Sequence, residues 1–278
     1  MMKTILITGN PDIAADAEAA GVSRIMVDLE TMGKKERQAS RTTFISSHNK
    51  EDVARVRSVL KNAELIVRVN PWHYHSEEEI LYAVGEGADF IMLPMIQDIQ
   101  HVRKAVGALS AHIKLLPLIE TSYSMECIAD IAAMKEIPEL YIGLNDLHLS
   151  LGLEFLFEPL AMGLLDAMAE NIRKHGKPFG FGGIAKMGSG ELPAERILAE
   201  HERLGSTRVI LSSRFCKDIS IESQEGRTSR IRDALVVMQQ EYLRLQTRDD
   251  TVRQQDFEHT ASIIMRIGNE LKLKRQAI

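Results

Sequence analysis

Eight short runs of Ile, Val and Leu recur along the chain, and longer amphipathic stretches separate them. Apolar residues are continuous within each run, which is typical of strands buried on both faces of a parallel sheet. Eight strands that alternate with helices favour a closed (β/α)8 barrel; an open doubly wound sheet is the alternative. The predicted strands are Thr4–Thr8, Arg24–Asp28, Leu65–Asn70, Phe90–Pro94, Lys114–Ile119, Leu140–Gly143, Pro178–Gly182 and Arg208–Ser212.

The segments between the runs carry the residues that begin and end helices. Asp12–Ala20 is one predicted helix, and Ser76 followed three residues later by Glu79 predicts a capping box at the start of another. Glycines end several of these helices, because glycine adopts the left-handed backbone that a helix end often needs. They are Gly21, Gly87 and Gly176.

Two further helices are predicted after about Arg227. The first places one apolar stripe on a single face, made of Ile231, Leu235, Met238, Tyr242 and Leu245. The second is surplus to one barrel, and its stripe is Phe257, Ala261, Ile264 and Leu271. This stripe must pack on the barrel or on another subunit. We predict a barrel domain over residues 1–226, and C-terminal helices over 227–278 that complete it and contact another copy in a homo-oligomer.

Composition excludes several classes of protein. The chain has 278 residues, a net charge of −5 and no basic patch, so a nucleic-acid partner is not expected. No apolar segment approaches the roughly 18 residues of a membrane helix, and no signal peptide is evident, so we expect a cytoplasmic protein without membrane contact. Cys127 and Cys216 form no CxxC pair and are predicted to be ordinary packed thiols.

Polar residues gather where the predicted strands end. In a (β/α)8 barrel the carboxyl ends of the strands carry the reacting groups. Carboxylate and amide oxygens there suit Mg²⁺ or Mn²⁺ better than zinc. The predicted metal ligands are Glu120 and Asp146, and the predicted catalytic or substrate-binding residues are Asp28, Glu30, Arg68, Asn70 and Asn145.

Each of these residues also has a structural explanation. Glu120 could form a structural pair, although a carboxylate after the apolar run KLLPLI is costly to bury without a partner. Asp146 could instead cap the following helical turn. Arg68, inside an apolar strand, needs either an acid such as Glu30 or a bound anion.

Other polar and small residues near the strand ends favour no single reading. His73, His75 and His148 lack the spacing of a zinc helix, so none is predicted as a ligand. The glycines of FGFGG could relieve crowding inside the barrel or admit substrate. A group of basic residues is predicted to form a solvated face that could also meet an anionic substrate, namely Lys34, Lys35, Arg37 and Arg41.

Four segments carry a resemblance to a known family. They read VDLE, LIVRVNP, LPLIETSYSMECIADIA and YIGLNDLHLSLG. In this order they resemble the family of citrate lyase beta subunits, malyl-CoA lyases and metal-dependent 4-hydroxy-2-oxoheptanedioate aldolases, from about Thr4 to Ser213.

The resemblance implies a mechanism. Glu120 and Asp146 would bind Mg²⁺ or Mn²⁺, Arg68 would contact the carbonyl oxygen of an oxoacid, and Glu30 would orient Arg68 or move protons. A pyruvate-like enolate would be stabilised by the cation and by Arg68. A carbon–carbon lyase that acts on a 2-oxo acid by aldol cleavage or condensation is therefore the leading hypothesis.

Three departures from the family pattern bear on this hypothesis. Thr31 stands where the aldolases carry a catalytic histidine, and the opening KTILITGN lacks the residues that bind coenzyme A. Ser122-Tyr123-Ser124-Met125, together with Asn145 and His148, replace small residues and imply an unusual acceptor pocket. The alternatives are a lyase of citramalyl- or malyl-CoA thioesters and a non-catalytic barrel that serves as a binding subunit.

Overall fold

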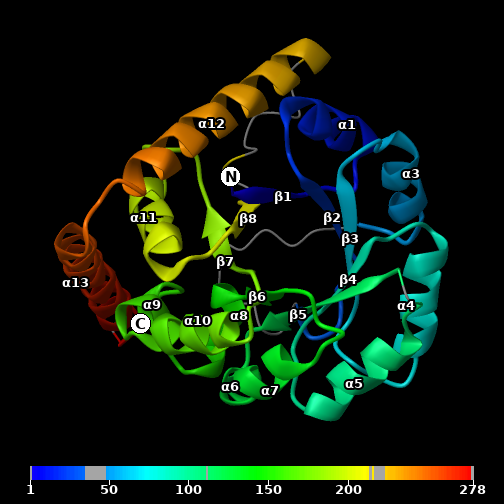
Figure 1. The fold of residues 1–278 in the computed structure, drawn as a ribbon, viewed down its shortest axis with the longest axis horizontal. Coiled ribbons are helices and arrows are strands. Elements are labelled where there is room, and N and C mark those ends of the chain that lie inside the picture. Colours follow the sequence, from blue (N-terminus) through cyan, green and yellow to red (C-terminus); the bar gives the residue numbers. More distant parts are fainter. Residues whose placement is uncertain (1, 35–47, 111, 213–214, 216–222, 277–278) are drawn as a thin grey trace.

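A closed barrel of eight parallel strands forms the centre of the protein (Figure 1). The computed structural model describes residues 2–34, 48–110, 112–212, 215 and 223–276. The strands pair in chain order, and β8 returns to β1. They are β1 (Lys3–Ile7), β2 (Arg24–Asp28), β3 (Glu64–Arg68), β4 (Phe90–Leu93), β5 (Lys114–Ile119), β6 (Leu140–Ile142), β7 (Phe179–Ile184) and β8 (Arg208–Leu211). The predicted (β/α)8 barrel is confirmed.

Helices surround the barrel (Figure 1). They are α1 (Pro11–Ala20), α3 (Glu51–Val59), α4 (Ser76–Gly85), α5 (Ile99–Ala108), α6 (Ser122–Glu126), α7 (Ile128–Ala133), α8 (Leu144–Ser150), α9 (Glu158–Ala161), α10 (Leu164–Lys174), α11 (Ala194–Leu204), α12 (Gln224–Leu245) and α13 (Asp250–Gln276). The glycines predicted to end helices all have a left-handed backbone, with φ of 104° at Gly21, 94° at Gly87 and 67° at Gly176.

The predicted capping box at the start of α4 is wrong. His75 occupies the N-cap and makes no side-chain capping bond, while the Ser76 hydroxyl contacts His73 instead. The Glu79 carboxylate accepts a hydrogen bond of 2.9 Å from the side-chain amide of Asn70. The Glu79 carboxylate thus binds Asn70 instead of the main chain at the start of α4, where the sequence pattern had placed it.

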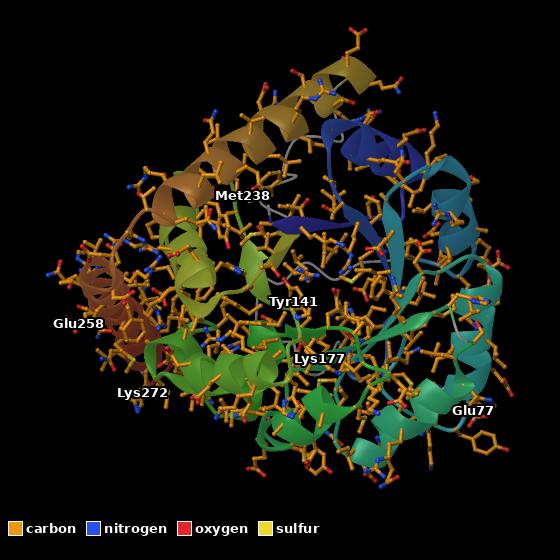
Figure 2. The ribbon with its side chains drawn as sticks, in the orientation of Figure 1. Glu77, Tyr141, Lys177, Met238, Glu258 and Lys272 are labelled. Carbon is orange, nitrogen blue, oxygen red and sulfur yellow. The ribbon has the colours of Figure 1, made fainter. Side chains whose placement is uncertain are left out.

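Apolar side chains fill the middle of the barrel. The inward set comprises Ile5, Met26, Ile66, Phe90, Met92, Leu116, Leu118 and Tyr141. Figure 2 shows Tyr141 within the ring of strands, where its hydroxyl donates to the Gly182 carbonyl oxygen at 2.7 Å and accepts from the Ile210 N–H at 2.7 Å. A Cβ on Gly180 would overlap the Tyr141 ring. At Gly180, the first glycine of FGFGG, the structure therefore favours relief of crowding.

Helix α12 lies between α11 and α1, the place of an eighth barrel helix (Figure 1). Every residue of its predicted stripe is buried. Helix α13 packs on α9 and α11 of the same chain, but its buried residues are Thr260, Ile264 and Gly268. Of its predicted stripe only Ile264 is buried. The contact is centred elsewhere because Gly268, which lacks a side chain, lets α13 approach Glu158 closely.

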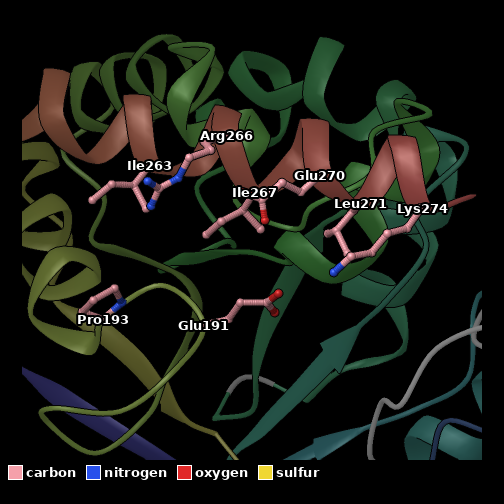
Figure 3. A pocket seen from close by; sticks show the side chains of 8 residues that line it. All are labelled: Glu191, Pro193, Ile263, Arg266, Ile267, Glu270, Leu271 and Lys274. Carbon is pink, nitrogen blue, oxygen red and sulfur yellow. The ribbon is translucent and has the colours of Figure 1, made fainter.

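A pocket lies between α13 and the segment before α11 (Figure 3). Ile263, Ile267 and Leu271 face Glu191 and Pro193 of the segment before α11. This pocket lies outside the ring of strands, and none of the predicted site residues lines it. A second subunit on the C-terminal helices, and the division of the chain at residue 226, stay predictions.

Two predictions made from composition have different outcomes. Within the described ranges, no helix is long and apolar enough to cross a membrane. Cys127 is a half-buried free thiol. Cys216 lies outside the described residues.

Candidate active site at the barrel mouth

Three strands end with a charged side chain that faces the barrel interior. Asp28, Arg68 and Glu120 each lie two residues after a side chain of the inward apolar set, and side chains two apart on a strand point to the same face. The carboxyl ends of β2, β3 and β5 therefore bring these charges together at one opening. We call this opening the mouth.

Arg68 and Asp28 form a bidentate ion pair in the mouth. Arg68 Nε lies 2.8 Å from Asp28 Oδ1 and Nη2 lies 2.7 Å from Oδ2. Glu30 is also close, with its Oε2 3.6 Å from Arg68 Nε. Burial raises the pKa of Asp28, but Arg68 and Lys34 outweigh it and hold this pKa well below its usual range. Asp28 is therefore held as an anion that orients Arg68, and the contacts on both of its oxygens make it a weak proton acceptor.

Lys34 is the second cation of the mouth, and its prediction as part of a solvated face is wrong. Its side chain is only 4% exposed, and Nζ lies 2.5 Å from Asp28 Oδ2 and 3.8 Å from Glu30 Oε2. Two buried acids require a compensating charge, and Lys34 supplies it. The spacing of four residues between Glu30 and Lys34 was the available sequence signal. The other basic residues of that group, at 35, 37 and 41, lie outside the described residues.

His48 is a mouth residue that sequence reasoning missed. Its Nδ1 accepts a hydrogen bond of 3.0 Å from the main-chain N–H of Asp28. Burial lowers the pKa of His48, and because Nδ1 accepts this hydrogen bond, the neutral ring would carry its proton on Nε2. A Cβ on Gly9 would lie 2.9 Å from His48 Cδ2 and 2.8 Å from Asp52 Oδ2. Glycine at position 9 thus admits His48, and no local pattern announces this contact.

Glu120 is held by the backbone of two neighbouring strand ends. Its side chain is buried, and Oε1 accepts a hydrogen bond of 2.9 Å from the Met95 N–H. Met95 has a φ of 49°, a left-handed conformation that is strained for a residue with a side chain. A Cβ on Gly143 would lie 2.6 Å from Glu120 Oε2. The position of the Glu120 carboxylate therefore depends on the strained backbone of Met95 and on the absence of a side chain at Gly143.

Asp146 and Asn145 lie in the first turn of α8, which follows β6, and the charge of Asp146 acts on Glu120. Asp146 is 7% exposed, but Gly143 is the N-cap, so the capping role considered for Asp146 is not the one observed. Asn145 is half-buried beside it. His148, on the same helix, is buried with Nδ1 3.0 Å from the Leu144 carbonyl oxygen, as expected of a structural histidine.

Asn70 has a structural use. Its side-chain oxygen accepts hydrogen bonds from the main-chain N–H groups of Thr31 and Met32, at 2.9 and 3.0 Å. Its side-chain nitrogen donates to Glu79. Asn70 therefore holds the segment after β2 in place, which favours this role over the predicted contact with substrate.

Among the residues that the structure describes, carboxylates outnumber cations in the mouth. The carboxylates are those of Asp28, Glu30, Glu120 and Asp146, and the cations are Arg68 and Lys34. Burial, followed by the charges of Asp146 and Glu30, raises the pKa of Glu120 well above its usual range, and Arg68 only partly opposes this shift. Among these described groups, negative charge is concentrated around Glu120.

A divalent cation fits this concentration of negative charge. The described residues contain no group of three His, Cys, Asp or Glu side chains able to hold a metal. Mg²⁺ commonly binds proteins through one or two carboxylates and takes its other ligands from substrate and water. Glu120 and Asp146 are hard oxygen donors of that kind.

Comparison with solved structures identifies chains of the same fold. An HpcH/HpaI aldolase from Desulfitobacterium hafniense DCB-2 is 16% identical with a TM-score of 0.60, over 76% of this chain and 86% of its own. Citrate synthase SbnG is 17% identical with a TM-score of 0.61, over 86% and 94%. The citrate lyase beta subunit from M. tuberculosis is 18% identical with a TM-score of 0.57, over 84% and 96%. At these identities the likeness concerns the fold.

The sequence itself assigns the family. No curated protein sequence matches the chain. The family model of HpcH/HpaI aldolase/citrate lyase matches residues 6–206, which include all the predicted site residues and most of the barrel. The predicted family is confirmed, and it supports an enzyme of the lyase class. The chain belongs to the HpcH/HpaI aldolase/citrate lyase family.

Proposed function

We propose that the protein catalyses divalent-metal-dependent aldol cleavage or condensation of a 2-oxo acid, with pyruvate or a close analogue as the enolate half. The observation that carries the proposal is the buried Glu120 carboxyl beside Asp146, with the Arg68 guanidinium near Glu120. An enolate of an oxoacid needs positive charge at its oxygens, and this arrangement can provide it from two sides.

Mg²⁺ or Mn²⁺ would be held by Glu120 and Asp146. When bound, the cation would supply charge that stabilises the developing enolate oxygen. The M. tuberculosis citrate lyase beta subunit, which shares the fold, was crystallised with oxaloacetate and magnesium, and this supports an oxoacid and a divalent cation here.

The protein side chains would orient the substrate and move protons. Asp28 occupies Nε and Nη2 of Arg68, which leaves Nη1 to donate to the carbonyl oxygen of the oxoacid. Because Arg68 and Lys34 engage both oxygens of Asp28, this carboxylate is a weak proton acceptor. Glu30 is then the acid of the DLE motif that remains for proton transfer, and Lys34 lies 3.8 Å from it.

The test is an assay of 4-hydroxy-2-oxo acid cleavage in which pyruvate release is measured. It is run with Mg²⁺ or Mn²⁺ and repeated after EDTA has removed the metal. We expect pyruvate only when metal is present. Exchange of the methyl protons of pyruvate with deuterated solvent isolates the enolate half. Activity confined to malyl- or citramalyl-CoA would contradict the proposal in favour of a thioester lyase. Metal binding without turnover of any oxoacid or thioester would favour a binding subunit.

A further inference from the structure

Ser212 places a buried hydroxyl at the mouth without a partner. It directly follows β8, and its Oγ is buried with no hydrogen-bond partner among the residues that the structure describes. Ile210 packs against the inward apolar set, so the period of two turns Ser212 into the barrel as well. A buried hydroxyl without a hydrogen bond is unfavourable, so a hydroxyl left in this state at a site mouth points to a ligand.

Gly183 lies beside Ser212 on the inward face. It pairs with Ile210 of β8, and a Cβ built on it would lie 3.7 Å from Ser212 Cβ and 3.6 Å from the Ile210 carbonyl oxygen. These are ordinary contact distances, and the Gly183 backbone is not left-handed. A small side chain could therefore be accommodated at this position, which the sequence fills with glycine.

The other inward glycines of the mouth differ from Gly183. The space that a side chain would take at Gly9 is filled by His48 and Asp52, and the space at Gly143 is filled by Glu120. Of these three glycines, only Gly183, at the edge between β7 and β8, has no described side chain packed tightly into the space beside it. The same edge carries the hydroxyl without a partner.

We propose that Gly183 and Ser212 receive the aldehyde half of the substrate, and that Ser212 Oγ binds a hydroxyl or carboxylate oxygen on it. The inference rests on the proposed function, which assigns the oxoacid half to Glu120, Asp146 and Arg68. In the aldol direction, the enolate carbon forms a bond with the aldehyde carbon, and the aldehyde oxygen gains a proton. The aldehyde must therefore lie beside the oxoacid, and the β1–β2 side is already occupied by Lys34 and His48.

Three two-carbon aldehydes test the proposal with the Mg²⁺-loaded full-length protein and pyruvate. Glyoxylate carries a carboxylate, glycolaldehyde carries a hydroxyl, and acetaldehyde carries neither. Ser212→Ala should lower kcat/KM for one or both of the oxygen-bearing aldehydes by about fivefold, the effect of one hydrogen bond, and change that for acetaldehyde less than about twofold. Loss with glyoxylate alone identifies a carboxylate ligand, and loss with glycolaldehyde alone identifies a hydroxyl.

Gly183→Ala probes the neighbouring space. Because the added methyl group meets only ordinary contacts, we expect thermal stability close to that of the wild type. The methyl group should nevertheless raise KM for all three aldehydes by about tenfold. Ser58→Ala is the matched control, since Ser58 is exposed on α3, and it should leave every constant unchanged.

Two outcomes separate this inference from the proposed function. If wild-type protein with Mg²⁺ exchanges no protons of pyruvate, the proposed function is wrong. If it exchanges them, but Ser212→Ala affects the three aldehydes equally or not at all, only the assignment of the β7–β8 edge is overturned.

Discussion

The two ends of the barrel both bury charged side chains, but they balance charge differently. At the amino ends of the strands lies a floor cluster, made of Lys3, Arg24, Glu64, Lys114, Glu139 and Arg208. At the carboxyl ends lies the mouth cluster, made of Asp28, Glu30, Lys34, Arg68, Glu120 and Asp146. The apolar interior of the barrel separates them.

Both acids of the floor cluster, Glu64 and Glu139, form ion pairs with cations of the same cluster. Arg24, whose side chain is 2% exposed, pairs with Glu139 and with Glu64 at 2.7 Å, and Arg208 pairs with Glu139 at 3.0 Å. Burial raises the pKa of Glu64, but Arg24 outweighs it and the net shift is downward. In the mouth cluster the pKa of Glu120 is instead raised. Among the described residues, cations of the chain thus compensate the acids of the floor, whereas Arg68 only partly compensates Glu120 in the mouth, where the proposed metal would bind.

Of the substitutions considered, loss of Glu120 from the mouth cluster should reduce activity the most. Glu120→Gln removes a proposed metal ligand, so activity should fall at least about 100-fold and Mg²⁺ affinity should fall with it. Its metal-free form should be as stable as the wild type or more stable, because the buried Glu120 carboxyl, whose ionisation is disfavoured by burial and by neighbouring acids, is gone. Calorimetric titration with Mg²⁺ and urea unfolding measure the two effects; unchanged Mg²⁺ affinity would show that the metal site is misplaced.

Glu139→Gln should have the opposite profile. It leaves Arg24 and Arg208 without their buried carboxylate, so the free energy of unfolding should fall by about 3–5 kcal/mol. Activity per folded molecule should stay close to that of the wild type, since Glu139 lies at the far end of the barrel. Urea unfolding and activity at low temperature measure both, and a selective loss of activity would show that the two ends are coupled.

Arg68→Lys should separate charge from geometry within the mouth. Lysine keeps the positive charge but cannot make the paired contacts of a guanidinium with Asp28. We expect activity to fall by about 10- to 100-fold, with Mg²⁺ affinity changed much less. Equal losses of activity and of metal affinity would mean that Arg68 acts on the metal site rather than on the substrate.

The smallest expected effect is a difference in pH dependence between the two ends. The raised pKa of Glu120 means that the metal-free folded protein keeps a proton that the unfolded chain loses above about pH 4.5. Stability should therefore fall as pH rises above that value, by at most about 1.4 kcal/mol per unit. The lowered pKa of Glu64 has the opposite sign, and its contribution is lost as pH falls below its unfolded value.

Urea unfolding of metal-free protein between about pH 5 and pH 7 checks this sign. Glu120→Gln should remove the downward slope, and saturating Mg²⁺ should remove it from the wild type. A slope that persists in Glu120→Gln would assign the effect to another group.

Local sequence patterns were enough to predict the fold and part of the candidate site. Continuous apolar runs marked all eight strands within two residues of their observed ends, because burial on both faces leaves a strong local trace. Glu120 and Arg68 could be identified because a charged residue within or directly after such a run is costly without a partner. Lys34 was assigned to the surface, because its spacing of four residues from Glu30 does not by itself show that two acids will surround it.

The sequence alone determined the barrel, its family, and the strand ends at which the charged residues of the mouth stand. Only the tertiary structure decided their partners: Asp28 rather than Glu30 as the closer partner of Arg68, Lys34 and His48 at the mouth, and a left-handed Met95 behind Glu120. Strand periodicity is a property of neighbours in the chain, and sequence reports it directly. Charge balance depends on residues from different strands and loops, whose distances exist only once the barrel has closed.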